Sequence, residues 1–112
     1  MKIALRPADS EEEWARLVAS HPATPYHQWG FLTWVAPLLE ARFVPLVVER
    51  DGVAVGVAPV LLQRVGPLAT ANVVPLQYVG PLVEAPDLLA TARELRRWGL
   101  RHRVAYLRVA LP

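Results

Sequence analysis

The stretch that decides the fold is Val44–Leu62, which reads VPLVVERDGVAVGVAPVLL. Two runs rich in Val and Leu flank Asp51-Gly52, a pair that favours the positive φ values of a tight hairpin turn. Gly56 predicts a bend or a close backbone approach. Pro59 predicts an edge position or a β-bulge, because proline cannot donate a hydrogen bond to a neighbouring strand. The sequence therefore predicts an antiparallel β-hairpin.

The residues before the hairpin predict a strand and two helices. Lys2–Pro7 is expected to form a short strand. Ser10 and Glu13 have the spacing of a capping box, which predicts a helix that begins after Ser10. That helix should end at His21-Pro22, because the residue before a proline avoids the helical region. A second helix is expected from about Gln28 onward.

Prolines and glycines divide the remainder of the chain. Pro37 lies inside the second helical pattern and predicts a kink or a restart there. After the hairpin, short strands are expected at Leu68–Thr70 and Leu76–Val79, with a turn at Gly80-Pro81. A third helix should begin at Pro86-Asp87, since proline suits the first turn of a helix.

The C-terminal part predicts the end of this helix and a last strand. Gly99 is expected to stop the third helix at its C′ position. Arg103–Val109 alternates between two faces as a strand does. The order is strand, helix, helix, hairpin, short strands, helix, strand. With 112 residues, the chain is predicted to form a single domain over residues 1–112.

Composition excludes several classes of protein. Hydrophobic residues make up 54% of the chain and charged residues 20%, which excludes intrinsic disorder. The absence of Cys excludes a disulfide scaffold and Cys-ligated metal sites. No apolar run reaches the ~18 residues of a membrane span, and the first apolar stretch is too short for a signal peptide. We therefore expect a cytoplasmic protein, and the 11 prolines are typical of a thermophile composition.

Charge is unevenly distributed along the chain. Residues 1–87 hold 6 basic and 9 acidic side chains, a net of −3, whereas residues 88–112 hold 6 basic and 1 acidic, a net of +5. The alternatives for this basic end are a solvated helix C-terminus and a surface that contacts phosphate, including that of a tRNA acceptor stem. The candidates for phosphate or RNA contact are Arg93, Arg96, Arg97 and Arg101.

Four segments together resemble the N-terminal half of FemAB-type proteins, within the acyl-CoA N-acyltransferase (GNAT) superfamily. The segments run in the family's order and are His21–His27 (HPATPYH) before a Trp-bearing helix, Glu49–Val60 (ERDGVAVGVAPV), Tyr78–Leu82 (YVGPL) and Ala105–Arg108 (AYLR). The resemblance implies an α+β, GNAT-like single domain with a mixed, mostly antiparallel sheet flanked by about three helices. FemAB-type chains resemble two fused GNAT-like domains and transfer aminoacyl groups, usually from aminoacyl-tRNA, onto cell-wall peptide precursors. This chain would correspond to the first half only.

The resemblance also implies a loop for the pyrophosphate of coenzyme A, of the form (Q/R)-x-x-G-x-(G/A), at the start of a helix. The nearest match is Gln63–Leu68, where Leu68 replaces the small residue and Pro67 removes an N–H donor. We expect a Gly-Pro turn between strands there and no autonomous acetyl-CoA site. The chain also lacks an Arg between Arg16 and Arg42, which departs from the family's pattern for binding precursor phosphates.

Other candidate site residues cluster around the aromatic loop. His21 and His27 lack the companions and spacing of a metal pair, so no metal site is expected. Tyr26 and His27 are the candidates for catalysis, with His27 the better group for proton transfer. Tyr26, His27 and Gly80 are predicted to line any substrate cleft, as aromatic wall, polar contact and close backbone approach. Glu11–Glu13 is expected to be a solvated helix start.

Two functions remain open from the sequence. The first is a non-catalytic half of an acyl- or aminoacyltransferase that recognises substrate or a partner, and the missing pyrophosphate loop favours it. The second is a dimeric N-acyltransferase or aminoacyltransferase with its site at the subunit interface. A high apolar content in a small domain predicts association, as a homodimer or by docking onto a separate catalytic chain.

Overall fold

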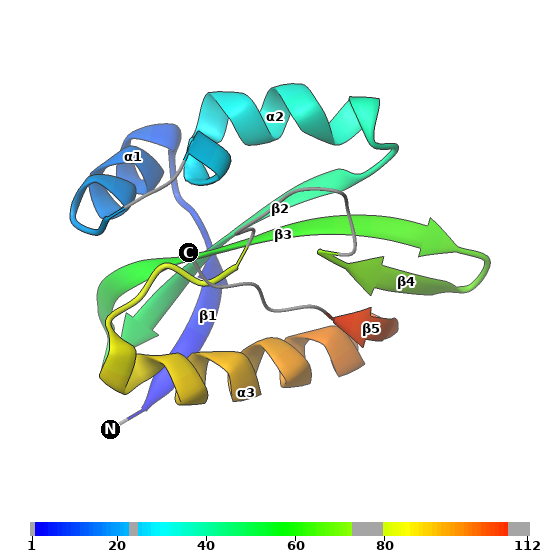
Figure 1. Cartoon of the computed structure of the whole chain (residues 1–112). Helices are drawn as coiled ribbons and strands as arrows, with labels where there is room; N and C mark the ends of the chain where they lie inside the picture. The colour runs from blue at the N-terminus through cyan, green and yellow to red at the C-terminus, as the bar shows by residue number, and fades with distance from the viewer. Residues whose placement is uncertain (1, 23–24, 73–79, 108–112) are drawn as a thin grey trace.

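The computed structural model of the chain describes residues 2–22, 25–72 and 80–107. These residues contain five strands, three α-helices and one 3-10 helix (Figure 1). In chain order they are β1 (Ile3–Pro7), α1 (Glu11–Ala19), η1 (Pro25–His27), α2 (Trp29–Leu38), β2 (Arg42–Arg50), β3 (Val53–Val65), β4 (Leu68–Ala71), α3 (Ala85–Arg101) and β5 (Val104–Leu107).

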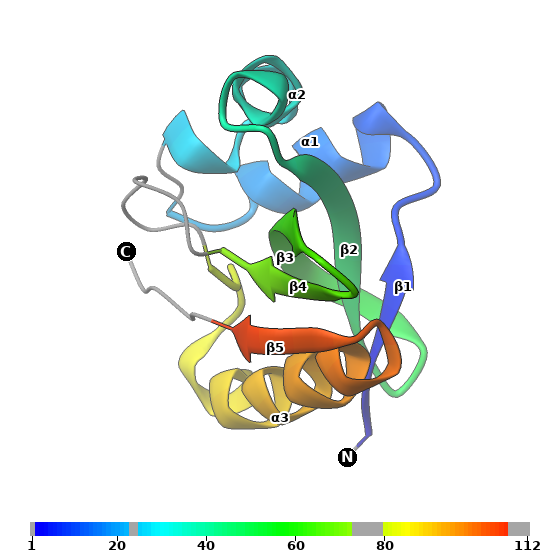
Figure 2. The same ribbon diagram turned by 90° about the vertical axis from the view of Figure 1, so that its right-hand side faces the viewer.

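The strands form one sheet in the order β1-β2-β3-β4-β5. The first three pairings are antiparallel, and β4 pairs with β5 in parallel. Helices α1 and α2 cover one face of the sheet and α3 covers the other, so the molecule has three layers (Figures 1 and 2). The α+β class and the mixed, mostly antiparallel sheet are therefore confirmed.

The hairpin of β2 and β3 has the predicted turn. Asp51 and Gly52 have φ values of 52° and 83°, which are the positive values that this two-residue turn requires. Both strands are longer than the sequence indicated, because β2 begins at Arg42 and β3 continues to Val65. A register shift between Val48 and Glu49 places one additional β3 residue opposite β2.

Pro59 pairs with β2 on one side, and on its other side no described strand pairs with this part of β3. Its partner on β2 is Pro45, and β4 pairs only with residues from Leu62 onward. Asn72 takes the place of a strand there, since its Nδ2 donates to the Pro59 carbonyl (3.1 Å) and its Oδ1 accepts from the Leu61 N–H (2.7 Å). The predicted edge position is therefore correct, and the missing N–H of Pro59 interrupts no pairing between strands.

Alternation along β2 and β3 divides the core into two parts. The first cluster lies between the sheet and helices α1 and α2, and it consists of Trp14, Leu17, Val18, Leu32, Ala36, Val47, Val57, Leu61 and Leu82. The second cluster lies between the sheet and α3, and it consists of Ile3, Leu46, Val48, Ala58, Val60, Leu62, Ala69, Ala71, Leu95 and Trp98. Neighbouring residues of one strand thus belong to different core clusters, which explains why these strands are apolar on both faces.

Helix α1 begins as predicted, but Glu13 has a different environment from the one expected. Ser10 Oγ accepts the Glu13 N–H at 3.1 Å, and the Glu13 carboxylate accepts the Asp9 N–H at 3.0 Å. Arg6 of β1 donates to both Glu13 oxygens (2.9 and 2.6 Å) and to Glu49 of β2 (2.7 Å). Glu13 is only 9% exposed, so the prediction of a solvated Glu11–Glu13 is wrong for Glu13.

Pro37 lies close to the C-terminal end of α2. It lies in the last turn, where the Glu40 N–H bonds to the Pro37 carbonyl and the Ala41 N–H to the Ala36 carbonyl. Glu40 has a φ of 53°, which completes a Schellman motif at the helix end. The expected restart is wrong, because the helix ends at Leu38 and the chain enters β2 at Arg42.

Gly99 does not end α3. The helix continues to Arg101, and Arg103, with a φ of 59°, takes the left-handed position after it. A Cβ on Gly99 would lie 3.3 Å from the Val104 Cβ, so this glycine lets α3 pack closely on β5. The predicted stop at Gly99 is wrong because its small size serves packing instead of chain reversal.

Most of the short C-terminal elements agree with the sequence. Strand β4 confirms the strand expected at Leu68–Thr70, and α3 begins within a residue of Pro86. The last strand is described as Val104–Leu107. The strand expected at Leu76–Val79 lies outside the described residues.

Gly56 should be intolerant of any side chain. A Cβ there would overlap the Leu82 carbonyl oxygen and lie 2.7 Å from Val83 Cγ1, because residue 82 pairs with β3 at Val57. Gly56→Ala should lower the free energy of unfolding by about 2–4 kcal/mol in urea denaturation. Gly30→Ala is the control: nothing lies within 4 Å of its Cβ, and alanine in a helix should stabilise by about 0.5–1 kcal/mol. Equal stability of Gly56→Ala and the natural chain would contradict the close approach.

The Arg6–Glu13 pair should make stability depend on pH in the acid range. Hydrogen bonds from Arg6 and from the Asp9 N–H lower the pKa of Glu13 to about 2 from its ordinary 4.5. The unfolded chain therefore binds the proton more readily, and the stabilisation is lost as the pH falls from 4.5 toward 2. Glu13→Gln should flatten this part of the pH profile and lower stability at neutral pH by about 1.5–3 kcal/mol.

Glu12→Gln provides the control for that measurement. Glu12 is exposed in the same helical turn, and its replacement should change stability at neutral pH by less than about 0.5 kcal/mol. An acid profile of the Glu13→Gln variant that matches that of the natural chain would show that the ion pair contributes nothing.

Candidate functional site

The predicted cleft residues His27 and Gly80 lie in direct contact. His27 ends η1, and its Nε2 lies 3.0 Å from the Gly80 carbonyl oxygen. The Trp14 indole N–H donates to the His27 carbonyl at 2.8 Å, which connects η1 to α1. The contact between residues 27 and 80 therefore connects the helical layer to the segment that leads into α3.

His27 is an interior group in this arrangement. Its exposed fraction is 0%, and burial lowers its pKa from the ordinary 6.5 against the opposing effect of the Gly80 carbonyl. A neutral imidazole whose Nε2–H donates to that carbonyl satisfies both observations. Tyr26 is half-buried and packs edge-to-face on Phe31, with ring centroids 5.6 Å apart. The catalytic and substrate-binding roles of Tyr26, His27 and Gly80 stay predictions.

The segment that was compared with a coenzyme A loop is the turn of a second hairpin. Val65 pairs with Leu68, and Gly66, with a φ of 62°, and Pro67 connect β3 to β4. No helix follows this turn, since Leu68 begins β4. Gln63 donates from its side-chain amide to the Leu39 carbonyl at 2.8 Å. Gln63–Leu68 therefore does not fit a pyrophosphate cradle, which needs N–H groups at the start of a helix.

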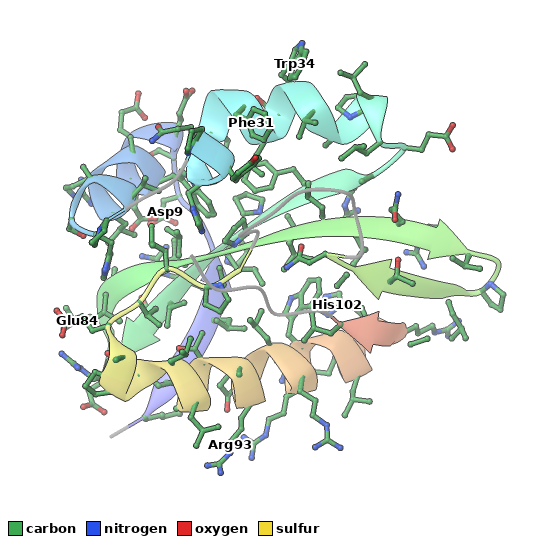
Figure 3. The ribbon with its side chains drawn as sticks, viewed as in Figure 1. Asp9, Phe31, Trp34, Glu84, Arg93 and His102 are labelled. Atoms are coloured by element: carbon green, nitrogen blue, oxygen red, sulfur yellow. The ribbon has the colours of Figure 1, made fainter. Side chains whose placement is uncertain are left out.

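The four predicted arginines of the basic end all belong to α3 and face outward. Arg93, Arg96, Arg97 and Arg101 are exposed, and Figure 3 shows Arg93 pointing away from the sheet. Among the described residues, only Arg97 of this set forms an ion pair, with Glu94 at 3.1 Å. The predicted helix face is thus a real basic surface.

A groove runs between α3 and the outer edge of β1. It has a volume of about 480 Å³, and we call it the α3–β1 groove. Its walls are Lys2, Ile3, Ala4, Leu5, Ala90, Arg93, Glu94, Arg97 and Arg101. Four cations and one carboxylate line it, so its charge favours anions. Sequence reasoning missed Lys2, which reaches the site only because β1 lies at the sheet edge beside α3.

A second basic depression adjoins the first at the end of α3. It is lined by Arg42, Leu62, Arg64, Arg101, His102 and Arg103, and we call it the arginine hollow. Arg42 and Arg64 were not predicted as site residues. The predicted hairpin was the available signal. Its turn at Asp51-Gly52 makes the two strands antiparallel, and this pairing places Arg42 opposite Leu62, two residues before Arg64.

The two loop histidines contact different backbone carbonyls. His21 Nε2 lies 2.8 Å from the Val55 carbonyl oxygen, whereas His27 contacts residue 80. The described residues bring no group of three or more His, Asp or Glu together that could hold a metal ion. In residues 2–22, 25–72 and 80–107, no helix is both long enough and apolar enough to cross a membrane.

Comparisons with known proteins give no relative. No protein-family model, curated protein or solved structure matches the chain. The fold and the charged surfaces therefore remain as the basis for inferring a function.

The buried His27 should make the fold sensitive to mild acid. Since its folded pKa lies below 6.5, the unfolded chain binds the proton more readily, and stability falls as the pH drops through 6.5. NMR titration of the ring protons should give a His27 pKa below 6.5. His27→Gln should lower stability at neutral pH by about 1–3 kcal/mol and flatten its dependence on mild acid. A ring that titrates at or above 6.5 would exclude a neutral buried imidazole.

Proposed function

We propose that this chain is a GNAT-like domain related to the N-terminal half of FemAB-type proteins and that it serves as a non-catalytic recognition half. In this role it binds a phosphate-bearing substrate of acyl or aminoacyl transfer, such as an RNA acceptor stem. The observation that carries the proposal is the α3–β1 groove with its four cations.

The arrangement of the elements supports the family part of the proposal. The described elements follow the order strand, two helices, antiparallel hairpin, short strand, helix and strand, which is compatible with the GNAT-like domain that the resemblance implies. Strands β4 and β5, which α3 connects in the sequence, pair in parallel, and this makes the otherwise antiparallel sheet mixed, as expected. The turn at residues 63–68 leads into β4 and not into a helix, so it lacks the N–H cradle of a coenzyme A site, which supports recognition over catalysis.

Charge supports the recognition of phosphate. Arg93 and Arg97 lie one helical turn apart on α3, so both side chains reach the same part of the groove. Lys2, which directly precedes β1, lines the same groove, as does Arg101 near the end of α3. Guanidinium groups suit phosphate because they donate two parallel hydrogen bonds.

A binding experiment with an RNA minihelix tests this function. Fluorescence anisotropy with the full chain should give an affinity that falls with added salt, as phosphate contacts require. Arg93→Gln/Arg97→Gln should make the negative slope of log K against log salt shallower by about 2, since two phosphate contacts are removed. Arg16→Gln is the control: Arg16 is an exposed cation on α1, across the sheet, and its loss should leave the slope unchanged.

The outcome also separates the recognition half from the alternative of a dimeric transferase. Binding that is independent of salt, or that the Arg93→Gln/Arg97→Gln variant retains in full, would remove the recognition proposal. Transfer of an acyl group from a coenzyme A thioester to an amine by the isolated chain, together with a dimer in light scattering, would favour the enzyme.

A further inference from the structure

The arginine hollow gathers cations from three separate parts of the chain. Arg42 begins β2, Arg64 lies near the end of β3, and Arg101–Arg103 form the end of α3 and its link to β5. Leu62 provides an apolar contact among them, and the hollow has a volume of about 300 Å³. Residues more than 60 positions apart in the sequence therefore converge on one small space.

Strand register explains why Arg42 and Arg64 share a face. Arg42 is paired with Leu62, and Leu62 belongs to the core cluster under α3. Paired residues of antiparallel strands lie on the same face, and so do residues two apart on one strand. Both guanidinium groups therefore belong to the sheet face that α3 covers, at the end of the sheet where α3 stops.

The link from α3 to β5 fixes the remaining wall. Arg103 has the left-handed φ of 59°, and its carbonyl accepts the Ala69 N–H at 3.0 Å. His102 stacks on Trp98 with ring centroids 4.2 Å apart, and its Nδ1 lies 2.7 Å from the Trp98 carbonyl oxygen. The hollow is thus held by a hydrogen-bonded turn and by a stacked ring, whose position Figure 3 shows at the end of α3.

These arginines differ from the structural arginines of the same protein. Arg6 and Arg50 are paired with Glu13 and Asp87, at 2.6 and 3.0 Å. In the described part of the chain, Arg42, Arg64, Arg101 and Arg103 form no ion pair and no side-chain hydrogen bond, and no carboxylate lines the hollow.

Stabilisation of a helix C-terminus by nearby cations accounts for Arg101 and Arg103, which lie at the end of α3 and just after it. Arg42 and Arg64 come from strands, so the helix dipole does not explain why they gather there. The four guanidinium groups are exposed, so water and salt weaken their mutual repulsion. An anion bound between them would reduce that repulsion further.

We infer that the arginine hollow binds a terminal phosphate group and has room for a diphosphate, through bidentate contacts from Arg42 and Arg64. The inference rests on the proposed function and deepens it, because it names the chemical group that one end of the basic surface recognises. A space of about 300 Å³ is at the lower limit for small-ligand sites. The ligand is either a free pyrophosphate or the 5′-phosphate end of a bound RNA, and both present a terminal phosphate group to the arginines.

Calorimetric titration of the full chain with inorganic pyrophosphate tests the inference at low salt. One molecule should bind per chain, and Arg42→Gln/Arg64→Gln should weaken the binding by about 100-fold, since each charge-assisted contact is worth about tenfold. Both residues are exposed, so the variant should keep the unfolding transition of the natural chain. Arg93→Gln/Arg97→Gln removes the same charge from the α3–β1 groove and should change pyrophosphate affinity by less than about threefold, because only long-range attraction is lost.

Two RNA minihelices, one with a 5′-phosphate and one with a 5′-hydroxyl, distinguish the sources of the phosphate. Tighter binding of the 5′-phosphate form that Arg42→Gln/Arg64→Gln abolishes would assign the hollow to an RNA end. Equal binding of both forms, with pyrophosphate binding retained, would assign it to a free diphosphate.

Failure of the inference is distinguishable from failure of the proposed function. The inference falls if pyrophosphate does not bind, or binds equally well to Arg42→Gln/Arg64→Gln. In that case RNA binding that depends on Arg93 and Arg97 would leave the recognition function standing. Conversely, pyrophosphate binding without any RNA binding would support the hollow and overturn the recognition of RNA.

Discussion

The pairing of β2 with β3 is the interaction on which the other elements depend. It runs from Arg42–Leu62 to Arg50–Val53 and provides apolar side chains to both faces of the sheet. A single hairpin would leave both faces exposed to water, so α1 and α2 must cover one and α3 the other. Helix positions, the sheet order and the location of both basic depressions follow from this register, because a slip of one residue would exchange the two core clusters.

A second consequence of the layering is a separation of charge. The helical layer of α1 and α2 has exposed carboxylates at Glu11, Glu12 and Glu40, while α3 has exposed arginines on the opposite side of the sheet. Two arginines of the sheet are paired with carboxylates of the helices, Arg6 with Glu13 and Arg50 with Asp87. These pairs connect helices to the sheet, whereas of the four α3 arginines only Arg97 has an ion-pair partner in the described part of the chain.

The sequence predicted the elements with strong local signals. Asp51-Gly52, the Ser10 cap and Gly66-Pro67 all form the predicted caps and turns, because their preference arises from a few neighbouring residues. Pro37 and Gly99 were misjudged for the opposite reason. The effect of each depends on what surrounds it: Pro37 falls in a last turn completed by a Schellman motif, and Gly99 meets Val104 of another element.

The candidate site was predictable only in part. The four α3 arginines and the contact between residues 27 and 80 concern residues that the sequence singled out, but the burial of His27 depends on packing across η1, α1 and the segment before α3. Local patterning by itself determined where the chain turns, which runs are strands or helices, and that the C-terminal part is basic. Only the tertiary structure decided that Lys2 joins Arg93 and that Arg42 and Arg64 meet the end of α3. Such meetings depend on strand register and layer packing, which act between residues far apart in the chain and leave no trace in a local pattern.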